Sequence, residues 1–243
     1  MDIDLKKHHH TGKNATQFGQ AGVLEKIFEI IGTTDKFFVE FGSEGTATGQ
    51  GNSYYLRRFG FDGLLMDAGA HVGKAIFDVK TEFINSKNII SLFIKYNVPK
   101  TFDFLSIDID NNDWYVFKSI LDWKLFRPRV ISVEASAHFP TNSDIIMPEL
   151  DYVKLPCRQH MVDGCKSEPA MGCSIIPLVK LANLHHYSYV AHCGVDAIFI
   201  DDNVLAQLPN IHWVDINDID KIHPGPIFFP FIPDKSFSSV DLI

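Results

Sequence analysis

The sequence predicts a doubly wound α/β domain with a mostly parallel sheet and an antiparallel closing strand. Short apolar runs alternate with segments of helical periodicity, which is the pattern of parallel βαβ units. Several of these runs end in a carboxylate, and one of them leads into a glycine-rich loop. A chain of 243 residues has room for one such domain with a buried core.

The predicted elements follow one another in a regular order. Apolar spacing predicts a helix over 17–31 that ends at Gly32, and a buried strand follows over 36–41. The later helices are predicted over 52–59, 86–96, 113–123 and 172–187, and the later strands over 62–67, 102–108, 129–134, 187–192 and 194–200. The last two strands are expected to form the closing hairpin.

Both ends of the chain and one internal stretch lack this periodicity. Residues 1–16 are polar, so we expect a flexible N-terminal segment followed by a single domain over 17–243. Residues 135–171 contain four prolines and are predicted to form a long excursion that shapes a substrate site. The proline- and phenylalanine-rich tail 224–243 is expected to be irregular and to pack on the body or on another subunit of a homo-oligomer.

Composition narrows the classes of function. A formal charge of −8 argues against a nucleic-acid partner. No apolar run reaches the ~20 residues of a membrane span, and no signal-like segment opens the sequence, so we expect a soluble cytoplasmic protein. The four cysteines are expected to be reduced. Cys157, His160, Cys165 and Cys173 leave a zinc site as an alternative, although their spacing matches no common zinc motif.

The first candidate site surrounds the glycine-rich loop 42–51. Glu40 and Gly42 stand where the predicted strand meets the loop, and Asp67 ends the next strand. In nucleoside-binding α/β folds, glycines let the backbone approach the ligand and the second acid accepts hydrogen bonds from ribose. The loop lacks the GxGxxG and GxxxxGK[ST] patterns, so an adenosyl ligand fits better than NAD, FAD or ATP. The alternative is a flexible turn with a solvated Asp67.

The second candidate site is an acidic strand end. Strand alternation would place Asp108 and Asp110 on one face, with Glu134 at the end of the neighbouring strand. Carboxylates held so close favour a hard divalent cation, Mg²⁺ or Mn²⁺. The alternative is that Asp110 N-caps the following helix and Asp113 only stabilises its first turn.

A histidine follows this strand end. His138 lies four residues beyond Glu134, where it could act as a general base or be a surface residue.

Five segments together resemble the Rossmann-like class I methyltransferases of the FkbM-related group, over about residues 17–200. They are Gln17-Phe-Gly-Gln-Ala-Gly22, Phe38-Val-Glu-Phe-Gly42, Phe61-Asp-Gly-Leu-Leu-Met-Asp67, Phe104-Leu-Ser-Ile-Asp-Ile-Asp110 and Arg127-Pro-Arg-Val-Ile-Ser-Val-Glu134. Asn111 departs from the family, which usually has glycine there. A narrower resemblance is to the methyltransferase part of viral glycan-building proteins.

The resemblance implies S-adenosylmethionine as the cofactor. Glu40, Gly42, Ser43 and Asp67 would hold it, with Asp108 near its amino-acid end. Metal-dependent O-methyltransferases, including those that act on sugars, carry acids at the ends of the fourth and fifth strands. Those positions correspond here to the predicted metal ligands Asp108, Asp110 and Glu134.

The leading hypothesis is an O-methyltransferase that acts on a sugar hydroxyl of a glycan. A divalent cation would ligate the hydroxyl, and His138 or Asp113 would take its proton. The alternative from another class is a noncatalytic nucleotide- or glycan-binding module on the same fold. A sugar oxidoreductase would need a Tyr-x-x-x-Lys helix turn, which Pro99 disfavours between Tyr96 and Lys100.

Overall fold

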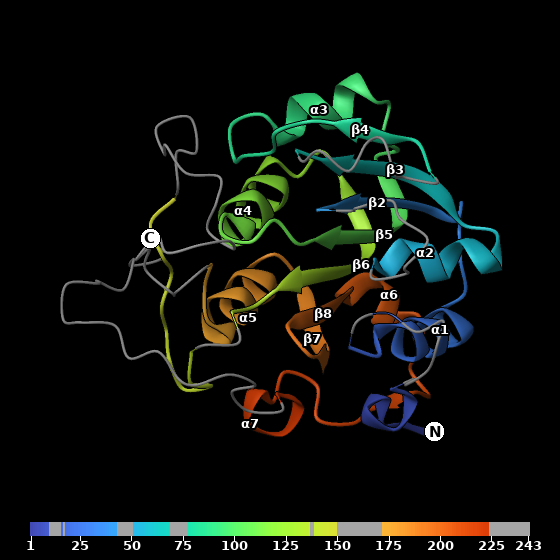
Figure 1. The fold of residues 1–243 in the computed structure, drawn as a ribbon. Helices are drawn as coiled ribbons and strands as arrows, with labels where there is room; N and C mark the ends of the chain where they lie inside the picture. Colours follow the sequence, from blue (N-terminus) through green and yellow to red (C-terminus); the bar gives the residue numbers. More distant parts are fainter. Residues whose placement is uncertain are drawn as a thin grey trace.

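The computed structural model describes residues 1–9, 16, 18–42, 51–68, 77–136, 139–149 and 172–223, and a seven-stranded sheet forms the centre of this part (Figure 1). The strands are β2 (Phe37–Phe41), β3 (Asp62–Asp67), β4 (Val79–Thr81), β5 (Thr101–Ile107), β6 (Arg127–Glu134), β7 (Tyr187–Cys193) and β8 (Asp196–Asp201). Their order across the sheet is β4-β3-β2-β5-β6-β8-β7.

All neighbouring strands of this sheet are parallel except at β8, which is antiparallel to both β6 and β7. The predicted doubly wound, mostly parallel sheet with an antiparallel closing strand is therefore confirmed. The chain builds outward from β2 to β3 and β4, then returns to β5 and continues to β6. The boundary between β2 and β5 is thus the switch point, where open α/β sheets bind their ligands.

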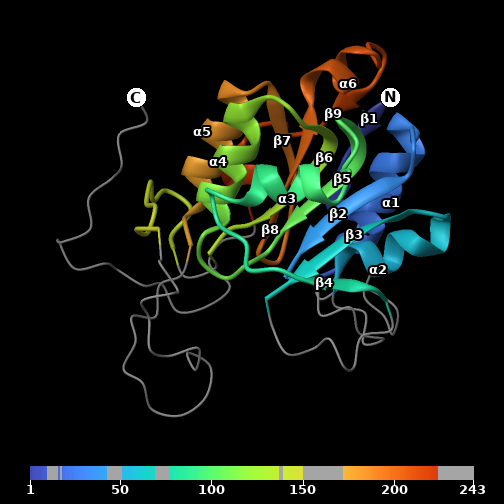
Figure 2. The same cartoon turned by 90° about the horizontal axis from the view of Figure 1, so that it is seen from above.

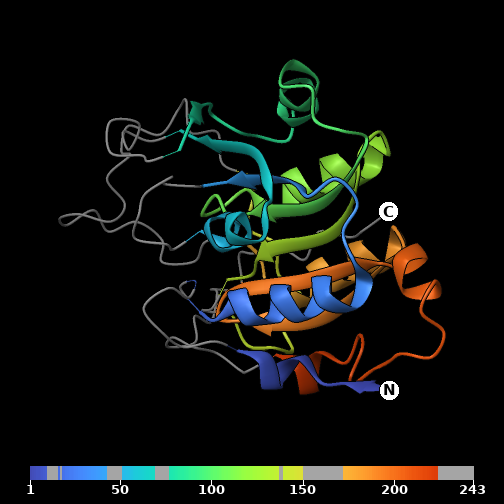
Figure 3. The same cartoon turned by 90° about the vertical axis from the view of Figure 1, so that its right-hand side faces the viewer.

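Helices cover both faces of the sheet (Figures 1 and 2). One face carries α3 (Ile89–Lys95), α4 (Asp113–Trp123) and α5 (Ile175–Leu184), and the other carries α1 (Gln20–Ile31), α2 (Asn52–Leu56) and α6 (Asp202–Ala206). Figure 3 looks onto the second face, where the blue helix α1 lies in front of the orange strands β7 and β8. Because each face is covered, the central strands are apolar on both sides and form two separate cores.

The helix boundaries follow from local sequence. In α1 the buried residues Val23, Leu24, Ile27 and Phe28 recur at helical spacing, and Gly32, with a φ of +65°, ends the helix. The helix α4 spans the predicted residues 113–123 and ends at Lys124, which has a left-handed φ of 52°. The predicted helix 52–59 is split into α2 and a short 3₁₀ turn, η2 (Arg57–Phe59).

The prediction of a flexible N-terminal segment is wrong for residues 1–9. They form β1 (Asp2–Ile3), which pairs in parallel with β9 (His212–Trp213), and the 3₁₀ turn η1 (Leu5–His8). Ile3 and Leu5 are each 4% exposed and pack into the core on the α1 face. Burial of these two apolar side chains, the pairing of β1 with β9 and the Lys6–Asp215 ion pair together offset the conformational entropy that the segment loses. The alternation of Ile3 and Leu5 was too brief to recognise in sequence.

The sequence also failed to predict three further short elements, β4, α6 and α7 (Ile219–Ile222). The tail 224–243 and residues 137–138 and 150–171 of the excursion lie outside the described residues. None of the helices in the described ranges has the length and apolar character that crossing a membrane requires.

Candidate functional site

Acidic residues gather at one edge of the sheet, where the parallel strands end. Glu40 lies near the end of β2, Asp67 ends β3, Asp108 follows β5 and Glu134 ends β6. The antiparallel strand β8 begins at the same edge, so its first residue, Asp196, is the pairing partner of Glu134.

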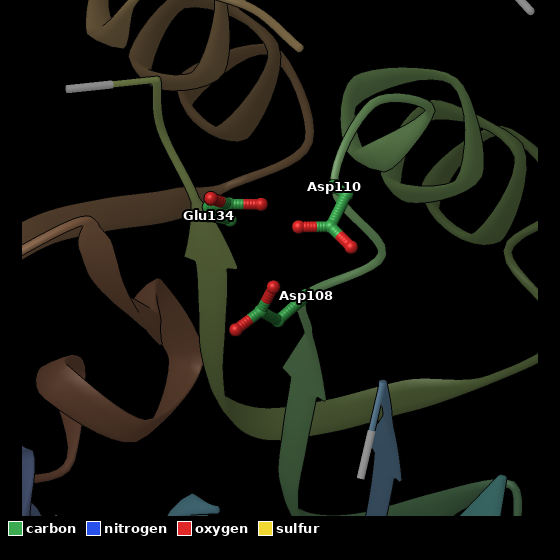
Figure 4. Close-up of side chains that lie close together, drawn as sticks. All are labelled: Asp108, Asp110 and Glu134. Carbon is green, nitrogen blue, oxygen red and sulfur yellow. The ribbon is translucent and has the colours of Figure 1, made fainter. Parts of the chain in front are cut away.

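Three of these acids form a group that could hold a metal ion. One carboxylate oxygen from each of Asp108, Asp110 and Glu134 lies within 4.8 Å of the other two, and the three side chains point toward one another (Figure 4). The first and third are partly buried, and Asp110 is exposed. The structure thus brings together the three acids predicted as metal ligands.

The physical reason for this arrangement differs from the prediction. The strand β5 ends at Ile107, so Asp108 and Asp110 are not alternate residues of one pleated strand. Asp110 instead adopts a left-handed φ of 70° in the turn between β5 and α4. This turn directs its carboxylate back toward Asp108 and Glu134.

The electrostatics of the group favour a positively charged ligand. Burial raises the pKa of both Asp108 and Glu134 well above their ordinary values, and the charges of neighbouring acids, including Asp113 and Asp196, raise them further. A hydrogen bond between the two carboxyl groups partly offsets this rise for Asp108. Desolvation by the surrounding side chains, together with the charge of Asp67, raises the pKa of Asp110, although its side chain still contacts solvent. A divalent cation would relieve this repulsion and displace the shared proton.

Asp113 organises the turn that carries these ligands. It is the first residue of α4, is 1% exposed, and accepts a hydrogen bond of 2.8 Å from the backbone N–H of Ile109. Burial raises the pKa of Asp113 to about 7. The N-cap of α4 is Asn112, which makes no side-chain cap, so the alternative that Asp110 caps this helix is wrong.

Gly42 lets the end of β2 approach the end of β5 at the switch point. Its φ is +67°, and a Cβ atom at this position would lie 1.7 Å from the carbonyl oxygen of Asp108. Any side chain would therefore collide with the backbone beside the acidic group. The close backbone approach seen at Gly42 is toward Asp108, and the predicted contact of Gly42 with a ligand stays a prediction.

Glu40 fixes the far end of the glycine-rich loop. Its carboxylate is 3% exposed and accepts hydrogen bonds from the backbone N–H groups of Asn52, at 2.6 Å, and Ser53, at 3.3 Å, and from the Ser53 hydroxyl. Burial raises the pKa of Glu40, while these hydrogen bonds lower it. Among the described residues, Glu40 thus contacts the start of α2 rather than open space.

The other predicted residues fall in three places. Asp67 ends β3, beside the acidic group. Ser43 and His138 lie outside the described residues. Three members of the alternative zinc site also lie outside the described residues. The fourth, Cys173, is fully buried, and its backbone forms an isolated antiparallel β-bridge with Ile146.

Sequence reasoning missed a buried polar network behind the acidic group. Its centre is Asp196, 3% exposed, which accepts hydrogen bonds from the Gln20 side-chain amide and, at 3.0 Å, from the Ser132 hydroxyl. Asn52 belongs to the same network, because its side-chain amide hydrogen-bonds to Asp196 and donates to the Ser106 hydroxyl at 3.0 Å. The usable signal was an aspartate at the start of the second hairpin strand, since an antiparallel strand begins at the edge where parallel ones end.

Comparisons with known proteins agree with this geometry. The sequence model of one family, described as the methyltransferase FkbM domain, matches residues 13–154. The match includes the ends of β2, β3, β5 and β6, and thus all the acids of the candidate metal group. Among curated proteins, none matches the chain.

Proposed function

Because the chain belongs to the FkbM methyltransferase domain family, we propose that it transfers the methyl group of S-adenosylmethionine to a sugar hydroxyl of a glycan, and that a divalent cation assists this transfer. The observation that carries the metal part of this proposal is the convergence of Asp108, Asp110 and Glu134. Three carboxylate ligands are the donor set that Mg²⁺ and Mn²⁺ prefer. A viral glycan-building setting remains a prediction from resemblance.

The residues at the switch point fit a positively charged adenosyl cofactor. When bound, S-adenosylmethionine supplies an electrophilic methyl group on a sulfonium, and the cation lowers the pKa of a hydroxyl that it ligates. Gly42 keeps the backbone of β2 close to Asp108, and Glu40 holds the start of α2 in place. Asp67, at the end of β3, is the proposed partner of the ribose hydroxyls.

The site residues have separate proposed roles. Asp108, Asp110 and Glu134 hold the cation, and the exposed side chain of Asp110 faces the acceptor. His138 or Asp113 takes the hydroxyl proton. A pKa of about 7 suits Asp113 for proton exchange near neutrality. Because its side chain is only 1% exposed, the acceptor hydroxyl would have to enter the turn between β5 and α4 to reach it.

The test is a transfer assay on candidate glycans, read by mass spectrometry with S-adenosylmethionine in the presence of Mn²⁺ or of EDTA. We expect a mass gain of one methyl group that disappears with the chelator. Methylation that persists in EDTA would remove the metal from the mechanism. Cofactor binding without transfer to any glycan would favour the noncatalytic binding module.

Asp110→Ala tests the metal group directly. Loss of one carboxylate should reduce transfer by at least 100-fold, because the hydroxyl is no longer ligated, while calorimetry shows nearly unchanged affinity for S-adenosylmethionine. The matched control is Asp144→Ala, which removes a surface carboxylate paired with Lys180 and should keep full activity. Loss of cofactor affinity in Asp110→Ala would assign Asp110 to the cofactor instead.

A further inference from the structure

Among the described residues, the polar network behind the acidic group contains one acceptor without a donor. The side chain of Asn52 is held by its own amide, which donates to Ser106 and helps to lower the raised pKa of Asp196. Its carbonyl oxygen, Oδ1, is buried and has no hydrogen-bond partner. Asn52 is 5% exposed, and a buried acceptor that lacks a donor costs free energy.

The neighbouring contacts fix which way this amide faces. If the amide were flipped, its oxygen would face the carboxylate of Asp196 and its NH₂ group would be the unpaired one. Gln20, which also donates to Asp196, differs from Asn52 because its own oxygen accepts a hydrogen bond of 2.9 Å from the Phe18 backbone N–H. The missing donor is therefore specific to Asn52.

In the same network, burial raises the pKa of Asp196, and the groups that donate hydrogen bonds to its carboxyl group are uncharged. The hydrogen bonds that lower the pKa of Asp196 come from Gln20, Ser132 and Asn52, all of them uncharged. The charge of Asp196 acts in turn on Asp108 and Glu134. A hydroxyl group could satisfy Asn52 alone, but only a cationic donor satisfies the oxygen and the charge together. A protonated amine has both properties.

Resting on the proposed function, we propose that Asn52 Oδ1 and the carboxylate of Asp196 form the subsite for the ammonium group at the amino-acid end of S-adenosylmethionine. Asn52 supplies a neutral acceptor and Asp196 the counter-charge. The two residues come from α2 and β8, which flank the switch point at the carboxyl edge of the sheet. The subsite would therefore select cofactors by their amino group and not only by their adenosine.

The test compares two ligands by isothermal titration calorimetry on the full chain. One is S-adenosylhomocysteine, and the other is the same molecule with its amino group replaced by hydrogen. We expect the wild-type protein to bind the first at least tenfold more tightly. In Asn52→Leu, which keeps the size of the side chain but removes the carbonyl, the affinity for S-adenosylhomocysteine should fall about tenfold while that for the analogue stays unchanged. Asp196→Asn should reduce the same preference.

The controls separate a subsite from a structural role. Asn210→Leu, at an exposed turn, should leave both affinities unchanged. If Asn52→Leu does not fold, Asn52→Ser takes its place, and the wild-type comparison needs no variant. Equal binding of the two ligands to the wild-type protein, or equal loss of both in the Asn52 variant, would overturn the subsite while leaving cofactor use intact. Failure of both ligands to bind the wild-type protein would instead overturn the proposed function.

Discussion

Gly42 is the residue at which a single side chain would disturb the site most. Gly42→Ala should destabilise the fold by about 3 kcal/mol or more, because strain at a positive φ adds to a Cβ placed 1.7 Å from the Asp108 carbonyl oxygen. Urea unfolding measures the change. Gly60→Ala is the matched control, since Gly60 has a φ of +80° but only the Lys36 ammonium at 3.8 Å, so we expect about 1 kcal/mol. Similar losses in both variants would contradict the steric argument.

A pair of histidines makes stability depend on pH. Burial lowers the pKa of His192 well below 6.5 and that of His223 to about 4, and the two rings lie 4.1 Å apart. Below pH 6.5 the unfolded chain takes up protons at these histidines that the folded chain does not, so their contribution to the free energy of unfolding decreases as pH falls from 6.5 to 4.

Replacing one of these histidines tests the effect. His223→Gln should remove about 1 to 2 kcal/mol of this decrease, less than the full shift because the ring of His223 is only partly buried. Urea unfolding at several pH values measures the slope. His212→Gln, at an exposed ring, should keep the wild-type slope. An unchanged slope in His223→Gln would contradict the prediction.

At the scale of elements, one buried ion pair joins α1, β2, β5 and β6. Arg129 on β6 contacts Asp103 on β5 at 2.6 Å and donates to the carbonyl oxygens of Ile31 and Gly32 at the end of α1. Asp103 also accepts hydrogen bonds from the backbone N–H groups of Thr34 and Lys36, just before β2. This pair fixes the edge of the sheet opposite the candidate site.

Arg129→Met should cost about 3–5 kcal/mol, because it leaves the carboxylate of Asp103 buried without its counter-charge. Chemical denaturation provides the measurement. Lys180→Met, which breaks the exposed pair with Asp144, should cost less than about 1 kcal/mol. Comparable losses of unfolding free energy in the two variants would show that burial does not make the Arg129–Asp103 pair more important for stability than an exposed pair.

The sequence predicted the longer elements because their apolar spacing is a local property. Residues 113–123 and 62–67 were predicted with the boundaries of α4 and β3. The three-residue strand β4 and the two-residue strands β1 and β9 were not, since so few residues carry no periodicity. These elements form through pairing with distant segments, as Ile3 does with Trp213.

At the scale of the whole molecule, the acidic edge couples cation binding, pH and stability. The raised pKa values of Asp108 and Glu134 contribute stability at low pH, which is lost as pH rises through the folded-state values. Without a divalent cation, the melting temperature should therefore fall as pH rises above the ordinary carboxyl range and through these raised values. Saturating Mn²⁺ should raise it by about 5 °C or more, and by more at higher pH, because binding requires ionised ligands.

Differential scanning fluorimetry with and without Mn²⁺ checks this coupling. Glu134→Gln removes one ligand charge and should abolish most of the Mn²⁺ effect, whereas Glu149→Gln, at an exposed position, should preserve it. A melting temperature that does not respond to Mn²⁺ at any pH would exclude a cation site at Asp108, Asp110 and Glu134.

By itself, the sequence determined that the protein is an α/β domain with carboxylates at its strand ends, because apolar periodicity and strand ends depend on residues that are neighbours in the sequence. Only the tertiary structure decided which ends meet. Asp196 reaches the acidic edge because β8 runs antiparallel, and Asp110 reaches it through a left-handed turn that Asp113 holds from inside. The order of the strands and the burial of side chains depend on contacts between distant segments, which no local pattern contains.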